Sequence, residues 1–102
     1  MNRQEKLEAM LADDPQDQLL RYMLAMELDK EGDHDRSLLS LDGLMNDDKP
    51  YVPAFLMAGQ QLTRLARTAE ARVAFQRGID EAQEQGEAHA FEELKRFLSE
   101  LD

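Results

Sequence analysis

The chain has 102 residues, the size of one domain, and its net charge of −10 argues against nucleic-acid binding, which depends on clustered lysine and arginine. The absence of cysteine excludes a disulfide framework, a thiolate nucleophile and a cysteine-ligated zinc ion. No apolar run approaches the roughly 18 residues that span a bilayer, and the charged N-terminus lacks the apolar core of a signal peptide. We therefore expect a water-soluble cytoplasmic chain that does not enter a membrane.

The charge is distributed unevenly along the chain. Residues 1–48 hold 13 acidic and 5 basic residues, residues 49–79 hold one acidic and five basic residues, and residues 80–102 hold eight acidic and two basic residues. One interpretation is a solvated surface that keeps the chain in solution. The other is a charge-guided contact, within the chain or with a partner, that involves the stretch from Arg64 to Arg77.

Helix-forming residues dominate and β-branched residues are few, so every element is expected to be a helix. A first helix over 2–13 precedes Asp14 and Pro15, which we expect to cap and to open the second helix. In that second helix, leucines recur every four residues from Leu20 to Leu28 and share one face.

The later helices have their own start and stop signals. Gly32 favours a left-handed stop and Asp33 can cap the third helix. Gly86 marks the break before a closing helix. The apolar face of this closing helix is expected to carry Phe91, Leu94, Leu98 and Leu101.

The apolar pattern returns after 34 residues without a gap. Leu28 corresponds to Leu62 and Met45 to Ile79, and small residues likewise correspond to small residues. Moving back by the same interval places the first helix in the second half of an earlier unit. An internal repeat of this length predicts stacked supersecondary units.

This pattern resembles the tetratricopeptide repeat, a helix-turn-helix unit of 34 residues. The resemblance covers residues 2 to about 85, in about two and a half repeats, and a closing helix follows. It implies an all-α, right-handed α-solenoid of antiparallel helix pairs with about six helices. The expected single domain, 1–102, divides into a leading half-repeat helix over 2–13, repeats over 15–48 and 51–85, and a capping helix over 87–101.

Small residues mark the contact between the two helices of a unit. Ala25 and Gly59 fall where the first helix should approach the second. Glycine inside a helix costs roughly 0.5–1 kcal/mol relative to alanine, so Gly59 is expected to have a packing role. The sequence departs from the family at Arg21, where a large apolar residue is usual, and at Ser37, where alanine is usual.

No pattern of residues predicts an active site. His34 stands between Asp33 and Asp35, but three adjacent residues cannot easily converge on one metal ion, and a capping role is expected instead. The serines lack a nucleophile elbow, and no phosphate or dinucleotide motif is present. We expect no enzyme activity, no cofactor and no metal. Metal-dependent activity at the Asp-rich turns is a remote alternative.

The resemblance implies a concave groove, lined by the first helix of each unit, that takes a peptide. The groove residues expected from it are Leu19, Tyr22, Met23, Met26, Leu56, Met57, Gln60 and Arg64. Their neighbours Asp29, Lys30 and Thr63 would extend the groove, and the closing helix would add His89, Glu92, Glu93 and Arg96. Methionine is adaptable and common on binding surfaces, although the methionines could instead fill gaps between repeats.

The leading hypothesis is a non-enzymatic module that binds a peptide segment of a partner protein in this groove. The clamp of lysine, asparagine and arginine by which chaperone-binding members hold a peptide carboxylate is not preserved. The alternative is self-association into a homodimer, because two and a half repeats make a short stack that leaves apolar surface uncovered.

Overall fold

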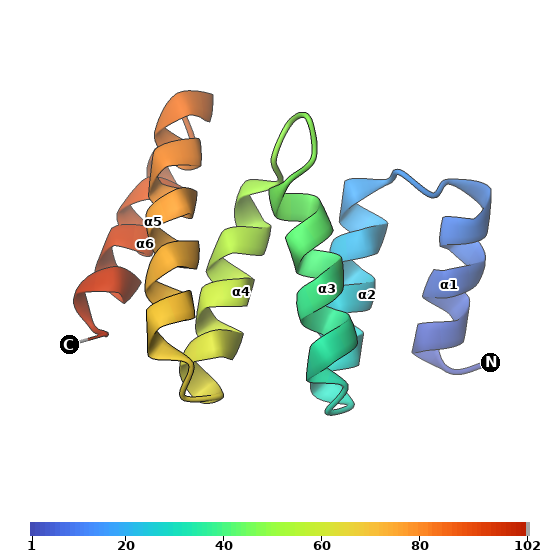
Figure 1. Ribbon diagram of the computed structural model, residues 1–102. Coiled ribbons are helices and arrows are strands. Elements are labelled where there is room, and N and C mark those ends of the chain that lie inside the picture. Colours follow the sequence, from blue (N-terminus) through green and yellow to red (C-terminus); the bar gives the residue numbers. More distant parts are fainter. Residues whose placement is uncertain (102) are drawn as a thin grey trace.

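The computed structural model describes residues 1–101, which form six α-helices and no strand. The helices are α1 (Arg3–Asp13), α2 (Gln18–Lys30), α3 (His34–Met45), α4 (Val52–Arg64), α5 (Thr68–Gln85) and α6 (Ala88–Ser99). They stand side by side in chain order, and α1 and α6 lie at the two ends of the row (Figure 1). The expected all-α fold of antiparallel helix pairs is confirmed.

The second helix begins later than its sequence suggested, and the capping role expected of Asp14 is wrong. Asp14 is the C-cap of α1, where its N–H donates to the carbonyl of Met10 at 3.2 Å. The N–H of Asp17 then donates to the carbonyl of Asp14 at 3.2 Å, which closes a turn that contains Pro15. The carboxylate of Asp17 accepts from the N–H of Leu20 at 2.9 Å, so Asp17 is the N-cap of α2.

The glycine stop signals lie where they were expected. Gly32 and Gly86 have φ angles of 84° and 72°, in the left-handed region that glycine adopts without a steric penalty. Asp33 follows Gly32 as the N-cap of α3, and its carboxylate accepts from the N–H of Arg36 at 3.4 Å. These turns reverse the chain and bring each helix back against the one before it.

The core is densest where α4 meets α5, and two glycines make that contact close. A Cβ atom on Gly59 would lie 2.2 Å from a ring carbon of Phe75 on α5. A Cβ atom on Gly78 would lie 2.6 Å from the Cβ of Phe55 on α4. Each helix therefore places a glycine against the phenylalanine of the other helix. The packing role expected of Gly59 is confirmed.

Arg21, which stands where the family usually has a large apolar residue, forms an ion pair. Its guanidinium donates to both carboxylate oxygens of Asp47, at 2.6 and 3.1 Å. Gln18 donates to the same carboxylate at 3.0 Å. The hydrogen bond from Arg21 is the main reason that the pKa of Asp47 lies below its ordinary value, and Gln18 adds to this effect. These contacts connect α2 to the loop between α3 and α4.

Ser37 and Gln61 form a buried polar connection across three helices. The hydroxyl of Ser37 on α3 donates to the carbonyl of Ala25 on α2 at 2.6 Å. It accepts from the side-chain N–H of Gln61 on α4 at 2.9 Å. Because the hydroxyl proton is already used, this contact fixes which end of the Gln61 amide faces Ser37. A serine at a usual alanine position therefore couples the first repeat to the second.

Gly59→Leu should lower the free energy of unfolding by about 1–3 kcal/mol or more, because the added side chain overpacks the contact with Phe75. Chemical denaturation followed by circular dichroism measures this change. Gln83→Leu adds the same side chain at an exposed position of α5 and should change stability little. A Gly59→Leu protein as stable as the wild type would contradict the packing assignment.

Asp47→Asn should destabilise the chain at neutral pH but not in acid. Since the pKa of Asp47 is lowered by folding, its contribution to stability is present above about pH 4 and is lost as the pH falls through the lowered pKa. Urea unfolding at a series of pH values should show the difference between wild type and variant shrinking below about pH 4. Asp48→Asn, at the exposed neighbouring position, controls for a general charge effect. A difference that stays constant with pH would refute the ion-pair account.

Candidate functional site

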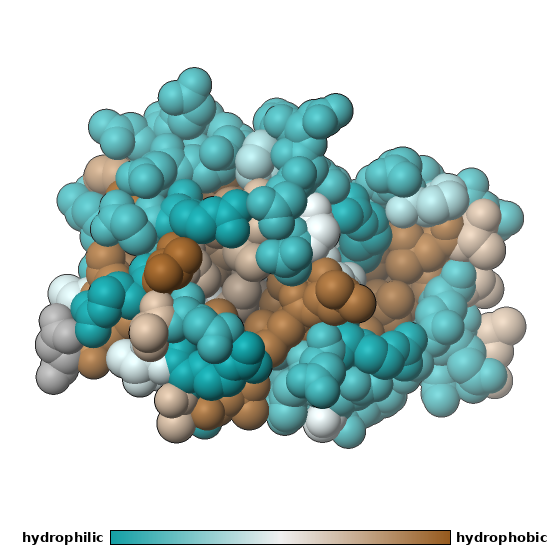
Figure 2. All heavy atoms as spheres, in the orientation of Figure 1, coloured by the Kyte–Doolittle hydropathy of each residue, from teal (hydrophilic) through white to brown (hydrophobic). Residues whose placement is uncertain are grey.

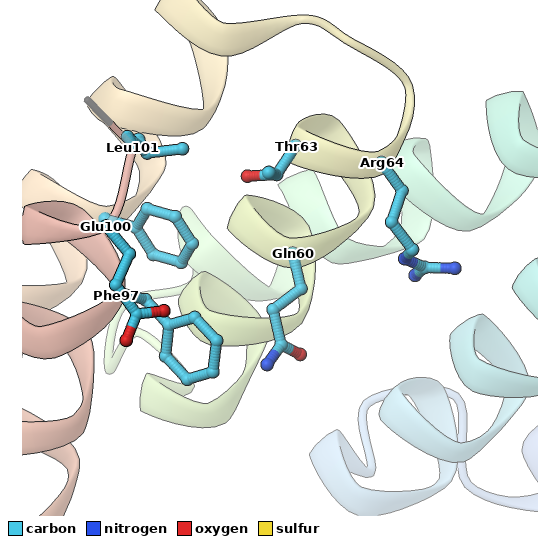
Figure 3. Close-up of a pocket in the computed structure, with 7 residues that line it drawn as sticks. Gln60, Thr63, Arg64, Phe97, Glu100 and Leu101 are labelled. Carbon is cyan, nitrogen blue, oxygen red and sulfur yellow. The ribbon is translucent and has the colours of Figure 1, made fainter.

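The first helices of the successive units, α2, α4 and α6, form one side of the stack, which we call the α2–α4–α6 face. A hollow of about 470 Å³ lies on this face between α4 and the C-terminal end of α6. Three side chains of α4 line one side of it and the end of α6 lines the other (Figure 3). The lining residues are Gln60, Thr63, Arg64, Phe75, Phe97, Glu100 and Leu101. We call this hollow the Phe97 pocket.

Two stacked phenylalanines lie at the pocket: Phe97 is partly exposed and supplies the apolar surface, and the Phe75 ring, only 1% exposed, packs behind it. The ring centroids of Phe75 and Phe97 are 6.0 Å apart, and the ring planes differ by 21°. Phe75 belongs to α5, and its ring lies at the pocket because Gly59 has no side chain in its way. The guanidinium of Arg96 lies 4.8 Å from the centroid of Phe97 and pairs with Glu100 at 3.8 Å. The pocket thus combines aromatic surface with a polar edge.

The α4 side of the pocket is polar. Thr63 donates from its hydroxyl to the carbonyl of Gly59 at 2.7 Å, and Arg64 donates to the carboxylate of Asp29 at 2.9 Å. Gln60 makes no side-chain hydrogen bond to any residue in the described part of the chain. Its amide is therefore available as both a donor and an acceptor.

Asp29, near the C-terminal end of α2, contacts one residue of α4 and one of α3. Its carboxylate accepts from Arg64 and also lies 2.9 Å from Nδ1 of His34. Arg64, in the basic central stretch, thus neutralises a residue of the acidic first part of the chain. Within residues 1–101, no three histidine, aspartate or glutamate side chains converge as a metal site would require.

Tyr22 and Tyr51 meet at the other end of the face. Their ring centroids are 5.4 Å apart and their planes meet at 62°, an edge-to-face contact. Burial raises the pKa of Tyr22 above its ordinary value, and the neighbouring Tyr51 and the carboxylate of Glu93 raise it further. Glu93, on α6, therefore lies close enough to Tyr22 for its charge to act on the phenol.

The eight expected groove residues differ in exposure. Gln60 and Arg64 line the Phe97 pocket, whereas Tyr22 is half-buried against Tyr51 and the core. Leu19 and Met26 expose 57% and 45% of their surface and are free to contact another molecule. The partly buried members are Met23, Leu56 and Met57, and the last two pack against the core. Met57 thus packs against the core, whereas Met26 is exposed.

Sequence reasoning missed Phe97, Leu101 and Tyr51 as members of the site. Phe97 follows the buried Leu94 by three residues and precedes Leu101 by four, so helical spacing could have placed all three on one face. Tyr51 precedes α4 in a loop, and no periodic pattern points to it. Glu100, which follows α6, also lines the pocket.

A second hollow, of about 350 Å³, lies on the opposite side of the stack between α3 and α5. Apolar atoms are visible in the hollowed surface between these helices in Figure 2. Val73 lines this hollow and is 58% exposed. Arg77 lines it as well, but its guanidinium is held by the side chain of Asn46 at 2.9 Å and lies over the ring of Phe55.

Comparison with known proteins identifies the family. The chain is 31% identical over 98 residues to a TPR repeat-containing protein of Pseudomonas aeruginosa, which covers 96% of this chain and 93% of that protein. It superposes with a TM-score of 0.81 on the solution structure of a Bordetella parapertussis protein (32% identity, 99% of this chain, 88% of the other). A tetratricopeptide repeat domain protein from Salinibacter ruber also gives 0.81 (31% identity, 86% and 89%). No family model matches.

The chain belongs to the tetratricopeptide repeat family. Its fold is that of a protein-interaction module in general terms, which agrees with the function expected from the sequence. Every helix within residues 1–101 is too short or too polar to cross a membrane.

The tyrosine contact can be tested by spectrophotometric titration. The chain has two tyrosines, so Tyr51→Phe leaves Tyr22 as the one phenol. Its pKa should remain above the ordinary value of about 10, because burial and Glu93 both disfavour the phenolate. Adding Glu93→Gln should lower the pKa, whereas adding Glu84→Gln on α5 should not. Ionisation of Tyr22 at the ordinary pH would show that the phenol is not enclosed.

Proposed function

We propose that this chain binds a peptide segment of another protein along the α2–α4–α6 face, with the Phe97 pocket as the main anchoring site. The observation that carries the proposal is the pocket itself, an aromatic hollow next to the unpaired amide of Gln60. A role in binding rather than in catalysis fits the family, whose members are generally scaffolds.

The chemistry of the pocket suits a peptide. The partly exposed ring of Phe97, supported from behind by the buried ring of Phe75, can cover an apolar side chain, and aromatic surface of this kind concentrates binding energy. The amide of Gln60 can donate to a peptide carbonyl and accept from a peptide N–H. Exposed Leu19 and Met26 on α2 would extend the contact beyond the pocket.

Self-association through the α3–α5 side is the second candidate. Leu39 and Val73 are 73% and 58% exposed, and Val73 lines the hollow on that side. A contiguous exposed apolar patch often marks a protein interface, and in a homodimer these two side chains would form part of one. A homodimer formed there would leave the α2–α4–α6 face open, so the two functions are compatible and must be measured separately.

The double variant Met26→Ala with Gln60→Ala should bind the partner at least tenfold more weakly, about 1.4 kcal/mol. The partner is first recovered from an extract of the source cells and identified by mass spectrometry, and its affinity is then measured by titration calorimetry. The side chain of Met26 is exposed and that of Gln60 is only partly buried, so the thermal stability of the variant should fall only modestly.

Glu84→Ala, at an exposed position of α5, is the matched control and should leave the affinity unchanged. A double variant that stays folded and binds the partner with wild-type affinity would contradict the proposal that the partner binds on this face. Sedimentation of the wild type and of Val73→Ser, measured in parallel, tests the dimer: a mass that falls on dilution and in the variant would support it.

A further inference from the structure

We infer that the segment bound on the α2–α4–α6 face is basic, with a lysine or arginine side chain that lies against the rings of Tyr22 and Tyr51 and pairs with the carboxylate of Glu93. This inference rests on the proposed function and adds the chemistry of the partner to it. Three observations support it: the arrangement of the two rings, the unpaired charge of Glu93, and the space beside them.

The two tyrosine rings form the walls of a corner. Their centroids are 5.4 Å apart and their planes meet at 62°, so they face an approaching group from two directions. A cation over the face of a tyrosine ring is attracted by the ring's π electrons, and more strongly when it is desolvated. Such a corner suits the ammonium group of lysine or the guanidinium of arginine.

Glu93 lacks the ion pair that two other acidic residues near the end of the chain have within residues 1–101. Glu92 pairs with Lys95 at 3.6 Å and Glu100 pairs with Arg96 at 3.8 Å, both on the same helix or its end. Glu93 is partly buried and has no ion pair in the described chain. This carboxylate is therefore available to pair with a cation from a partner.

The charge of Glu93 acts on the tyrosine corner. It raises the pKa of the Tyr22 phenol, after the larger effects of burial and of Tyr51. The carboxylate of Glu93 on α6 is therefore within electrostatic range of the Tyr22 phenol on α2, and Tyr22 in turn contacts Tyr51 in the loop before α4. Cation–π attraction and charge pairing would act on the same partner group.

A hollow beside Tyr51 has room for a long side chain, although neither Tyr22 nor Glu93 lines it. A hollow of about 270 Å³ is lined by Tyr51, by Gln18, which precedes Tyr22 by four residues on α2, and by Ala90, which precedes Glu93 by three on α6. Its rim carries one cation, Lys49, and one anion, Glu87.

The wider charge balance favours a basic partner over an acidic one. The two arginines next to the Phe97 pocket are already engaged, Arg64 with Asp29 and Arg96 with Glu100. The chain as a whole carries a net charge of −10, which attracts cationic segments and repels anionic ones. An acidic segment would find few free cations on this face.

The test uses the full chain and a displayed library of random 12-residue peptides. Selection on the wild type should enrich peptides that combine lysine or arginine with a large apolar residue. Glu93→Gln, which keeps the shape of the side chain, should weaken these peptides about tenfold and reduce the salt dependence of their affinity. Glu93→Lys should reverse the preference, so that replacing the basic residue of a peptide by glutamate restores binding.

Two further variants separate this inference from the proposed function. Phe97→Leu reshapes the pocket conservatively and should weaken basic and neutral peptides alike, whereas Glu84→Gln on α5 should weaken none. One outcome is that the selected peptides are not enriched in basic residues, bind Glu93→Gln as tightly as wild type, and lose affinity for Phe97→Leu. This outcome would overturn the inference of a basic partner and would still support peptide binding on this face. A library that yields no peptide sensitive to either Glu93→Gln or Phe97→Leu would overturn both.

Discussion

The fold and the candidate site both depend on the close contact between Gly59 of α4 and the ring of Phe75 on α5. Because a Cβ atom at Gly59 would come within 2.2 Å of that ring, the contact excludes every other residue type in this geometry. The ring reaches the α2–α4–α6 face and stacks on Phe97 of the last helix. The absence of a side chain at Gly59 thus lets α4 and α5 pack closely and places the buried ring of Phe75 behind Phe97 of the closing helix.

The first repeat shares an apolar core with the second, and a polar contact adds to it. Arg21 pairs with Asp47 inside the first repeat, and the hydroxyl of Ser37 connects the backbone of α2 to Gln61 of α4. Hydrogen bonds of this kind are directional, so they set how α2 lies relative to α4 more narrowly than apolar packing alone would. Tyr22 is carried on α2, and its contact with Tyr51 therefore depends on this polar connection.

The repeat could be predicted from the sequence because its signals are local and periodic. Apolar residues at helical spacing, the glycine stops and the small residue at Gly59 each report a physical requirement of the helix pair that contains them. The site was predicted only in part. Gln60 and Arg64 were predicted from the 34-residue register. That register does not describe Phe97, which lies on α6 after the two full repeats, or Tyr51, which lies in the loop before α4.

The central claim is that a partner binds the face organised by Phe75 and Phe97. Backbone amide chemical shifts of the ¹⁵N-labelled chain, recorded while a selected peptide or the natural partner is added, test it most directly. The account predicts shifts that concentrate on α2, α4 and α6, around Tyr22, Gln60 and Phe97, with little change near Val73 on α5. Shifts confined to α3 and α5 would contradict it.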